Sequence, residues 1–181
     1  MERPGSRKGK GRPMIRGFDG KIPVVADSAF VSEAAYVVGD VEIGERASVW
    51  PGAVIRGDFA KIRIGSLSII EDNSVIHSGM DLVIGSQVII GHGAVVHCSR
   101  IGNHVLIGSH ATILDNVEID DLCMIGAGSL LTPGTRVPSM SYVLGAPGQV
   151  KGRLSAEQIA RLKEGAGTYA RLALKYRESG L

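Results

Sequence analysis

The chain is poor in aromatic residues and in cysteine. Its 181 residues include one tryptophan, four tyrosines and three phenylalanines, so aromatic side chains make up 4% although 44% of the residues are hydrophobic. A doubly wound enzyme would normally contain more aromatic rings, so we expect an interior of aliphatic and small side chains. Cys98 and Cys123 are too few for a disulfide framework, and no signal-peptide pattern is present. We therefore expect a reduced, cytoplasmic protein.

The chain also lacks a strong net charge and a long apolar segment. Its formal net charge is +2, and no apolar run approaches the roughly 18 residues that span a bilayer. Neither a membrane nor a nucleic-acid partner is implied. Residues 1–12 hold five basic residues against one acidic residue. We predict a disordered basic tail there, with electrostatic contact to an anionic partner as the functional alternative.

What the chain has in abundance is glycine, 25 residues in all, and aliphatic residues that recur at six-residue steps. The longest unbroken series is Ile101, Ile107, Ile113, Ile119, Ile125, Leu131 and Val137. Shorter series with the same step precede it: Ile43, Val49 and Ile55, then Ile64, Ile70 and Ile76, then Ile84, Ile90 and Val96. A period of six fits neither an α-helix nor simple strand alternation, so it predicts short strands joined at corners.

This repeat resembles the left-handed parallel β-helix of the hexapeptide-repeat superfamily. The resemblance implies a triangular coil of about six turns over residues 13–153, and a trimer. A β-sandwich is the alternative, but its turns would recur every 8 to 12 residues or so. From Ser155, the segment SAEQ has the form of a capping box, and Gly180 supplies a stop. The predicted fold is thus mainly β, followed by one C-terminal helix in residues 154–181, packed outside the prism.

Two of the five histidines occupy the same position in the repeat. His77 follows Ile76, and His97 follows Val96. The two histidines are 20 residues apart, which is one 18-residue coil plus the two-residue slip before Ile84. Their imidazoles should therefore lie on adjacent coils, about 4.8 Å apart. Such a pair can share a metal ion, since zinc binds imidazole nitrogen at about 2.0–2.1 Å.

A third histidine, His92, cannot join this pair within one chain. It precedes His97 by five residues along an extended face, a separation of roughly 16 Å. In a trimer, however, His92 of one subunit could face His77 and His97 of its neighbour. The alternative is that these are surface or interface histidines making hydrogen bonds. His104 and His110 have no such partners in the repeat, and we take them as structural.

The segment from residue 48 to residue 97 looks like a γ-class carbonic anhydrase. The resemblance lies in SVWPGAVIRGDFAKIRIG, IIEDNSVIH and VIIGHGAVVH. It implies that His77, His92 and His97 bind zinc, or iron or cobalt in some members, and that the adjacent subunit contributes His92. It also implies a homotrimer that converts CO₂ to bicarbonate.

The resemblance assigns further site residues. Three polar side chains match a family trio near the subunit boundary: Arg56, Asp58 and Asp72. Arg56 would pair with Asp72 across that boundary, as a guanidinium fork suits a carboxylate. A trimer-stabilising ion pair is as good an interpretation as a catalytic one. Tyr142 matches a tyrosine often placed near the metal.

The chain departs from the family at two positions and in one loop. Glu71 stands where the family has a glutamine that orients the metal's water, and Ile69 stands where it has asparagine. An ionised glutamate accepts hydrogen bonds but cannot donate one, and its charge would raise the pKa of the water. The acidic loop of the most active members is missing, since only Asp81 lies between His77 and Ile84.

These observations favour metal-assisted hydration of CO₂, with Glu71 or a second water handling the proton. Two alternatives stay open. One is acyl transfer from acyl-CoA with a single histidine as general base. The other is a non-catalytic metal-binding or scaffold trimer that keeps the site for stability.

Overall fold

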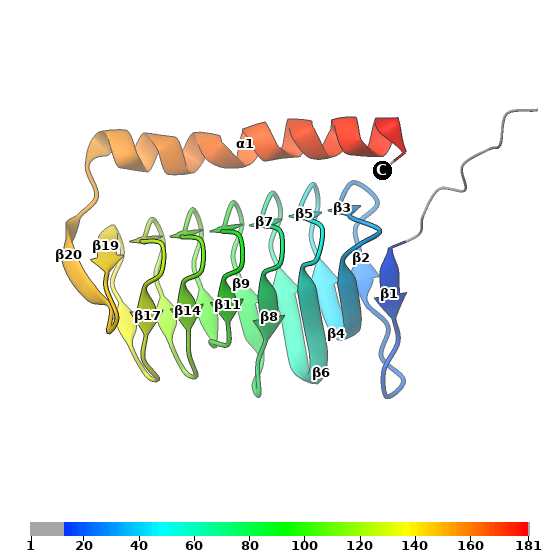
Figure 1. Ribbon diagram of the computed structural model, residues 1–181, viewed down its shortest axis with the longest axis horizontal. Coiled ribbons are helices and arrows are strands. Elements are labelled where there is room, and N and C mark those ends of the chain that lie inside the picture. The colour runs from blue at the N-terminus through cyan, green and yellow to red at the C-terminus, as the bar shows by residue number, and fades with distance from the viewer. Residues whose placement is uncertain (1–12, 181) are drawn as a thin grey trace, which may run out of the picture.

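The computed structural model describes residues 13–180, so the basic tail expected at residues 1–12 lies outside the described part. The described chain is a parallel β-helix with one long helix running beside it (Figure 1). Within residues 13–180, no helix is both long and apolar enough to cross a membrane. The prediction of a mainly β solenoid followed by a single C-terminal helix is confirmed.

Three rows of short parallel strands form the prism. The first row is β1 (Met14–Arg16), β4 (Tyr36–Ile43), β6 (Val54–Ile64), β8 (Val75–His77), β11 (Val95–Val96), β14 (Thr112–Ile113) and β17 (Leu130–Leu131). The second is β2 (Val24–Val25), the latter halves of β4 and β6, β9 (Leu82–Ile84), β12 (Arg100–Ile101), β15 (Glu118–Ile119) and β18 (Arg136–Val137). The third is β3 (Phe30–Val31), β5 (Ser48–Val49), β7 (Ile69–Ile70), β10 (Ile89–Ile90), β13 (Leu106–Ile107), β16 (Met124–Ile125) and β19 (Ser141–Leu144), closed by the antiparallel β20 (Gln149–Arg153).

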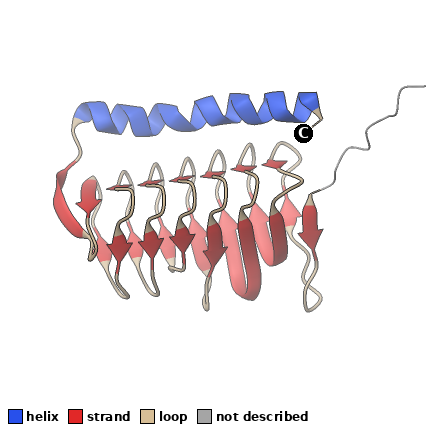
Figure 2. Ribbon diagram, in the orientation of Figure 1, coloured by secondary structure: helices blue, strands red, loops and turns tan. Residues whose placement is uncertain are grey.

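The number of turns is about seven, one more than the sequence suggested. Each row holds seven parallel rungs. The long strands β4 and β6 bend across two rows, because β8 pairs with the first part of β6 and β9 with the last. Because β4 and β6 continue from the first row into the second, these two rows form one continuous sheet. The third row forms a separate sheet (Figure 2).

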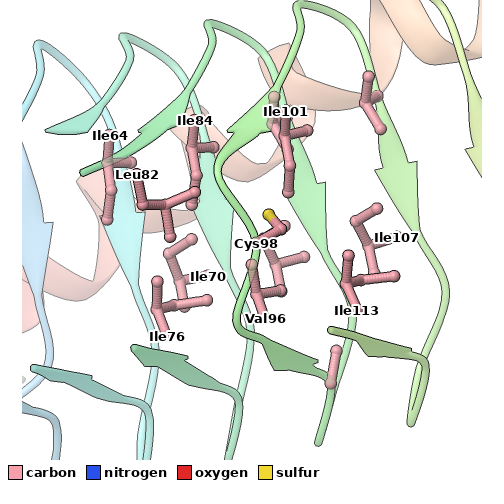
Figure 3. Close-up of a cluster of buried hydrophobic side chains, with 14 of the residues drawn as sticks. Ile64, Ile70, Ile76, Leu82, Ile84, Val96, Cys98, Ile101, Ile107 and Ile113 are labelled. Atoms are coloured by element: carbon pink, nitrogen blue, oxygen red, sulfur yellow. The ribbon is translucent and has the colours of Figure 1, made fainter. Parts of the chain in front are cut away.

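The six-residue series forms the core. Ile76, Val96 and Ile113 pair from rung to rung on the first row, and all three are fully buried. Ile70, Ile90 and Ile107 do the same on the third row. Figure 3 shows these columns of aliphatic side chains meeting inside the prism, with Cys98 among them. Burial raises the pKa of the Cys98 thiol to about 12, so this cysteine packs as a neutral apolar residue.

The corners of the prism leave little room between rungs. A Cβ built on Gly65 would lie 2.5 Å from the carbonyl of Gly85 on the next rung, so no larger residue fits there without a shift of backbone. Other corners place a side-chain-bearing residue at positive φ, among them Asn73 at 59° and Asn116 at 57°. Asparagine tolerates this conformation better than most residues. The abundant glycine of the chain is thus used in part for close packing of successive coils.

The helix α1 (Ala156–Ser179) packs against the third face, outside the prism. The backbone N–H of Gln158 donates to Ser155 Oγ, and the Ser155 N–H donates to Gln158 Oε1, which confirms the capping box. Gly180 ends the helix at φ 78°. The contact is aromatic: the rings of Trp50 and Tyr176 lie 5.1 Å apart, and those of Phe30 and Tyr176 lie 5.8 Å apart. Tyr169 also packs on Trp50, with 6.1 Å between the ring centroids, so four of the chain's eight aromatic rings attach this helix.

Candidate metal centre

The structure places His77 and His97 side by side on the first face. His77 ends β8 and His97 follows β11, and these strands pair in the register Ile76 to Val96. The two imidazole rings lie 5.2 Å apart, centroid to centroid. Because Ile76 and Val96 point into the core, the residue after each points outward. The adjacency expected from the repeat is confirmed.

His77 is held by a carboxylate at its Nε2 atom. Nε2 lies 2.9 Å from Asp58 Oδ1, and the other oxygen of Asp58 lies 3.1 Å from Arg56 Nη1. Burial acts to raise the pKa of Asp58, but the hydrogen bond with His77 and the charge of Arg56 outweigh it and hold that pKa below its usual range. Within the chain, then, Arg56 pairs with Asp58, and its pairing with Asp72 across a subunit boundary stays a prediction.

His97 is held by a carboxylate at its other ring nitrogen, Nδ1, whereas His77 is held at Nε2. Nδ1 lies 3.0 Å from Asp115 Oδ1. A carboxylate on Nδ1 favours the tautomer whose Nε2 lone pair is available for a metal. The sequence interpretation missed Asp115. The signal was present, however, because the 18-residue coil step leads from His97 to Asp115.

His92 lies at the corner before β11, apart from this pair. Its Nδ1 lies 3.1 Å from Asp72 Oδ2, and its Nε2 lies 3.2 Å from Glu71 Oε2. The His92 side chain is 55% exposed, whereas that of Glu71 is only 6% exposed. His92 is thus anchored on a buried carboxylate while its ring faces away from its own prism.

The buried Glu71 has a second neighbour that sequence reasoning missed, Tyr169 of α1. The pKa of Tyr169 is raised to about 12, first by burial and then by its hydrogen bond with Glu71 and the negative charges of Glu71 and Asp72. The tyrosine therefore stays protonated and can donate its hydroxyl to the carboxylate. The only signal for it was its place on the apolar stripe of the predicted helix. Through this contact, α1 reaches the group that supports His92.

Comparisons with known proteins agree with this geometry. Residues 98–133 match the family described as bacterial transferase hexapeptide (six repeats). Over 170 residues the chain is 38% identical to "Gamma carbonic anhydrase 1, mitochondrial" of Arabidopsis thaliana, covering 90% of the chain and 62% of that protein. It is 45% identical over 152 residues to the "Probable carbonic anhydrase" of Methanocaldococcus jannaschii, covering 83% of the chain and 96% of the relative. This chain belongs to the γ-class carbonic anhydrase family.

The γ-class chain has the same fold as solved structures described as transferases. A hexapeptide transferase family protein of Anaplasma phagocytophilum superposes with a TM-score of 0.87 at 37% identity, covering 90% of the chain and 98% of that structure. The fold alone therefore does not separate hydration from acyl transfer, and the side chains must do so. The chain also spans only about three fifths of the Arabidopsis relative's length.

Two residues to which the resemblance drew attention, Tyr142 and Ile69, lie on the third face, away from the histidine pair. Tyr142 is in β19, paired with Met124 of β16 and Gly152 of β20. The structure does not bring it to His77 or His97 within the chain, so its place near the metal stays a prediction. Ile69 of β7 is buried beneath α1 and belongs to the helix-packing cluster. Its apolar side chain is explained by that contact.

The imidazole donors of the γ-class chain suit zinc, iron or cobalt, but one chain alone supplies an incomplete set. Within residues 13–180, no three His, Cys, Asp or Glu side chains come together as a metal site requires. His77 and His97 form a pair, and His92 stands apart. Of the other two histidines, His110 lies over Gly93, where an added Cβ would be 2.6 Å from the imidazole, and His104 has a buried Nδ1 without a partner among the described residues.

Proposed function

We propose that this protein hydrates CO₂ to bicarbonate at a metal held by His77 and His97 of one subunit and His92 of a neighbour in a homotrimer. The observation that supports this most directly is the 5.2 Å spacing of the His77 and His97 rings. An acyltransferase that uses one histidine as general base has no need of such a pair. The activity would be that of a lyase, a carbonate dehydratase.

The first face of the prism, which carries His77 and His97, also offers a surface on which subunits could assemble. Outward-facing residues on the first row form a mainly apolar column of Val54, Val75, Val95 and Leu130, interrupted by Thr112. Val95 remains 39% exposed in the single chain. This column lies on the face that carries two of the three proposed metal ligands. Its burial against another copy of the chain would cover the apolar side chains and bring in the third ligand. We infer a closed trimer in which each first face meets the His92 corner of the next subunit.

Zinc is the metal we favour, with Fe²⁺ or Co²⁺ as alternatives. When bound, it would act as a Lewis acid and lower the pKa of a coordinated water towards about 7. His77, His92 and His97 would hold it, and Asp115 would keep the His97 ring in the binding tautomer. Glu71 accepts a hydrogen bond from Tyr169, and its Oε2 lies 3.2 Å from His92 Nε2, where it would accept a proton. Phe59 would shield His77, since their rings lie 5.5 Å apart.

The roles of Arg56, Asp58 and Asp72 follow from their contacts. Asp58 and Asp72 each touch a proposed ligand, His77 and His92 respectively, and Arg56 neutralises Asp58. We propose that they orient the imidazoles and join the subunits. The cytoplasmic location of the protein also remains a proposal from its sequence.

Metal content, oligomeric state and CO₂ hydration, measured on one preparation, test this function. We expect a trimer with about one zinc, iron or cobalt ion per chain and hydration activity that chelation removes. The His97→Ala variant is the control and should be metal-poor and inactive. Metal-free protein that turns over acetyl-CoA would establish acyl transfer instead. A metal-loaded trimer with no hydration activity would favour the alternative of a non-catalytic metal-binding or scaffold protein.

A further inference from the structure

Three arginines line a hollow beside α1, and none of the proposed metal ligands borders it. The hollow lies between the last turns of α1 and the first two coils and has a volume of about 190 Å³. Two successive corners of the prism contribute Ser28, before β3, and Arg46, before β5. The helix contributes Ala170, Arg171, Ala173, Leu174 and Arg177.

The hollow lies where small side chains of α1, rather than large ones, face the prism. Tyr169 and Tyr176 fill the space between α1 and the third face with rings. Ala170 and Ala173 end at Cβ and leave space above the coil. The long side chains of Arg171 and Arg177 border that space and place their charges around it.

Among the arginines of residues 13–180, these three differ from most of the others because no carboxylate lies within ion-pair distance of them. Among residues 13–180, five arginines form ion pairs: Arg56, Arg63, Arg100, Arg136 and Arg161. Arg46, Arg171 and Arg177 form none within the same range. Like charges gathered at one concavity repel each other unless an anion joins them.

The polar contacts inside the hollow leave the positive charge in place. Arg171 Nη2 donates to Thr168 Oγ1 at 3.1 Å, which is a neutral acceptor. The backbone N–H of Arg46 donates to Ser28 Oγ at 2.9 Å, and Ser28 in turn donates to Glu45 at the rim. Neither contact neutralises a guanidinium group, because Thr168 is uncharged and Arg46 donates its backbone N–H rather than its side chain.

We propose that this hollow binds a small phosphate-class oxyanion, either inorganic phosphate or the phosphate group of a small ester. Guanidinium groups recognise tetrahedral oxyanions through paired N–H donors, and Arg46, Arg171 and Arg177 border the hollow with such groups. The inference is independent of the proposed hydration activity, because none of these side chains is a proposed metal ligand. Its occupant would connect the end of α1 to the first coil.

The test is titration of the full-length protein with sodium phosphate at a constant ionic strength of about 0.15 M, followed by calorimetry. We expect saturable binding by the wild type. Arg46→Gln, Arg171→Gln and Arg177→Gln should each weaken it about tenfold, the usual effect of losing one charged hydrogen bond. The triple variant should show no binding. A parallel titration with glycerol phosphate identifies the source, since tighter binding of the ester would point to a phosphorylated metabolite.

Arg153→Gln is the matched control. Arg153 is also exposed and forms no ion pair within residues 13–180, but it lies on β20 outside the hollow and contacts Met140 Sδ. Its substitution should leave phosphate binding unchanged. The inference would be overturned by absence of saturable binding in the wild type, or by equal weakening in Arg153→Gln and the three single variants. Circular dichroism of each single variant checks that its fold is intact.

Discussion

The imidazoles of His77 and His97 face each other at 5.2 Å, with their planes tilted by 54°, although 20 residues separate them in the chain. The register of β8 with β11 fixes this contact. No comparable contact ties His92 to either ring. The two halves of the proposed metal site therefore have different origins, one within a chain and one between chains.

Subunit mixing should reveal this division. His77→Ala and His92→Ala chains should each form folded trimers without metal, because each lacks one ligand of every site. In mixed trimers, the intact His92 of one chain can meet the intact His77 and His97 of the other, so some metal binding should return. Metal analysis after verified subunit exchange is the measurement. If exchanged trimers stay metal-free, the shared site is wrong.

Asp115 should matter for metal affinity although it does not touch the metal. Asp115→Ala removes the carboxylate that orients His97, and we expect a loss of about 10- to 100-fold in zinc affinity. Asp115→Asn, which keeps an oxygen acceptor, should lose less. Asp120→Ala is the control, since Asp120 is exposed and pairs with Arg100 instead. Competition with a chelator measures the zinc affinity of each variant. Equal zinc affinities for all variants would show that Asp115 does not support the metal site.

Glu71→Gln should alter the pH dependence of hydration. A buried carboxylate beside the metal opposes the loss of a proton there, so its removal should move the midpoint of the pH–rate profile downward and raise activity near pH 7. A shift of one unit corresponds to about 1.4 kcal/mol. Rates are measured from about pH 6 to pH 9. Lower turnover, restored by added imidazole, would instead identify Glu71 as the proton-transfer group.

Tyr169→Phe should change stability in alkaline solution. The folded-state pKa of Tyr169 is about 12, above its ordinary value of 10.0. The folded state therefore holds this proton more tightly than the unfolded state, and the stability from this difference is complete below about pH 10 and is lost as pH rises towards 12. The variant should lose stability less steeply over that interval. Denaturant unfolding at several pH values provides the comparison, and parallel curves for both proteins would contradict it.

The aliphatic columns should dominate folding stability. Ile107→Ala removes a fully buried side chain from the third row, and we expect a loss of about 2–5 kcal/mol in the free energy of unfolding. Ile22→Ala is the control, because Ile22 is 71% exposed, and its effect should stay within about 0.5 kcal/mol. Chemical denaturation measures both. Equal effects would mean that the columns are not the main source of stability.

The fold could be read from the sequence because a six-residue period allows few structures. Ile76 and Val96 were expected in the same position of the repeat, and they pair in adjacent strands. The capping box at Ser155 set the start of the helix within a residue. Only the number of turns was underestimated, because the early coils, where β4 and β6 run across two faces, show the repeat least clearly.

The site was only partly predictable. The register placed His77 beside His97, but it could not show which nitrogen each ring presents or which carboxylate holds it. Asp115 and Tyr169 escaped notice because one lies on the next coil and the other on a helix. Contacts between separate elements depend on packing, which a repeat does not encode. The neighbouring subunit that we propose to meet His92 is not part of a single chain.

The course of α1 also bears on the order in which the protein is made. The helix leaves the last rung and runs back along the third face to the first coils, where Tyr176 meets Phe30 and Trp50 (Figure 1). On the ribosome, the first coils emerge early, yet the side chains that cover Phe30 and Trp50 are among the last to be synthesised. The apolar surface of Phe30 and Trp50 is therefore exposed to solvent through most of translation. Nascent chains stalled before residue 169 should accordingly bind chaperones that complete chains do not.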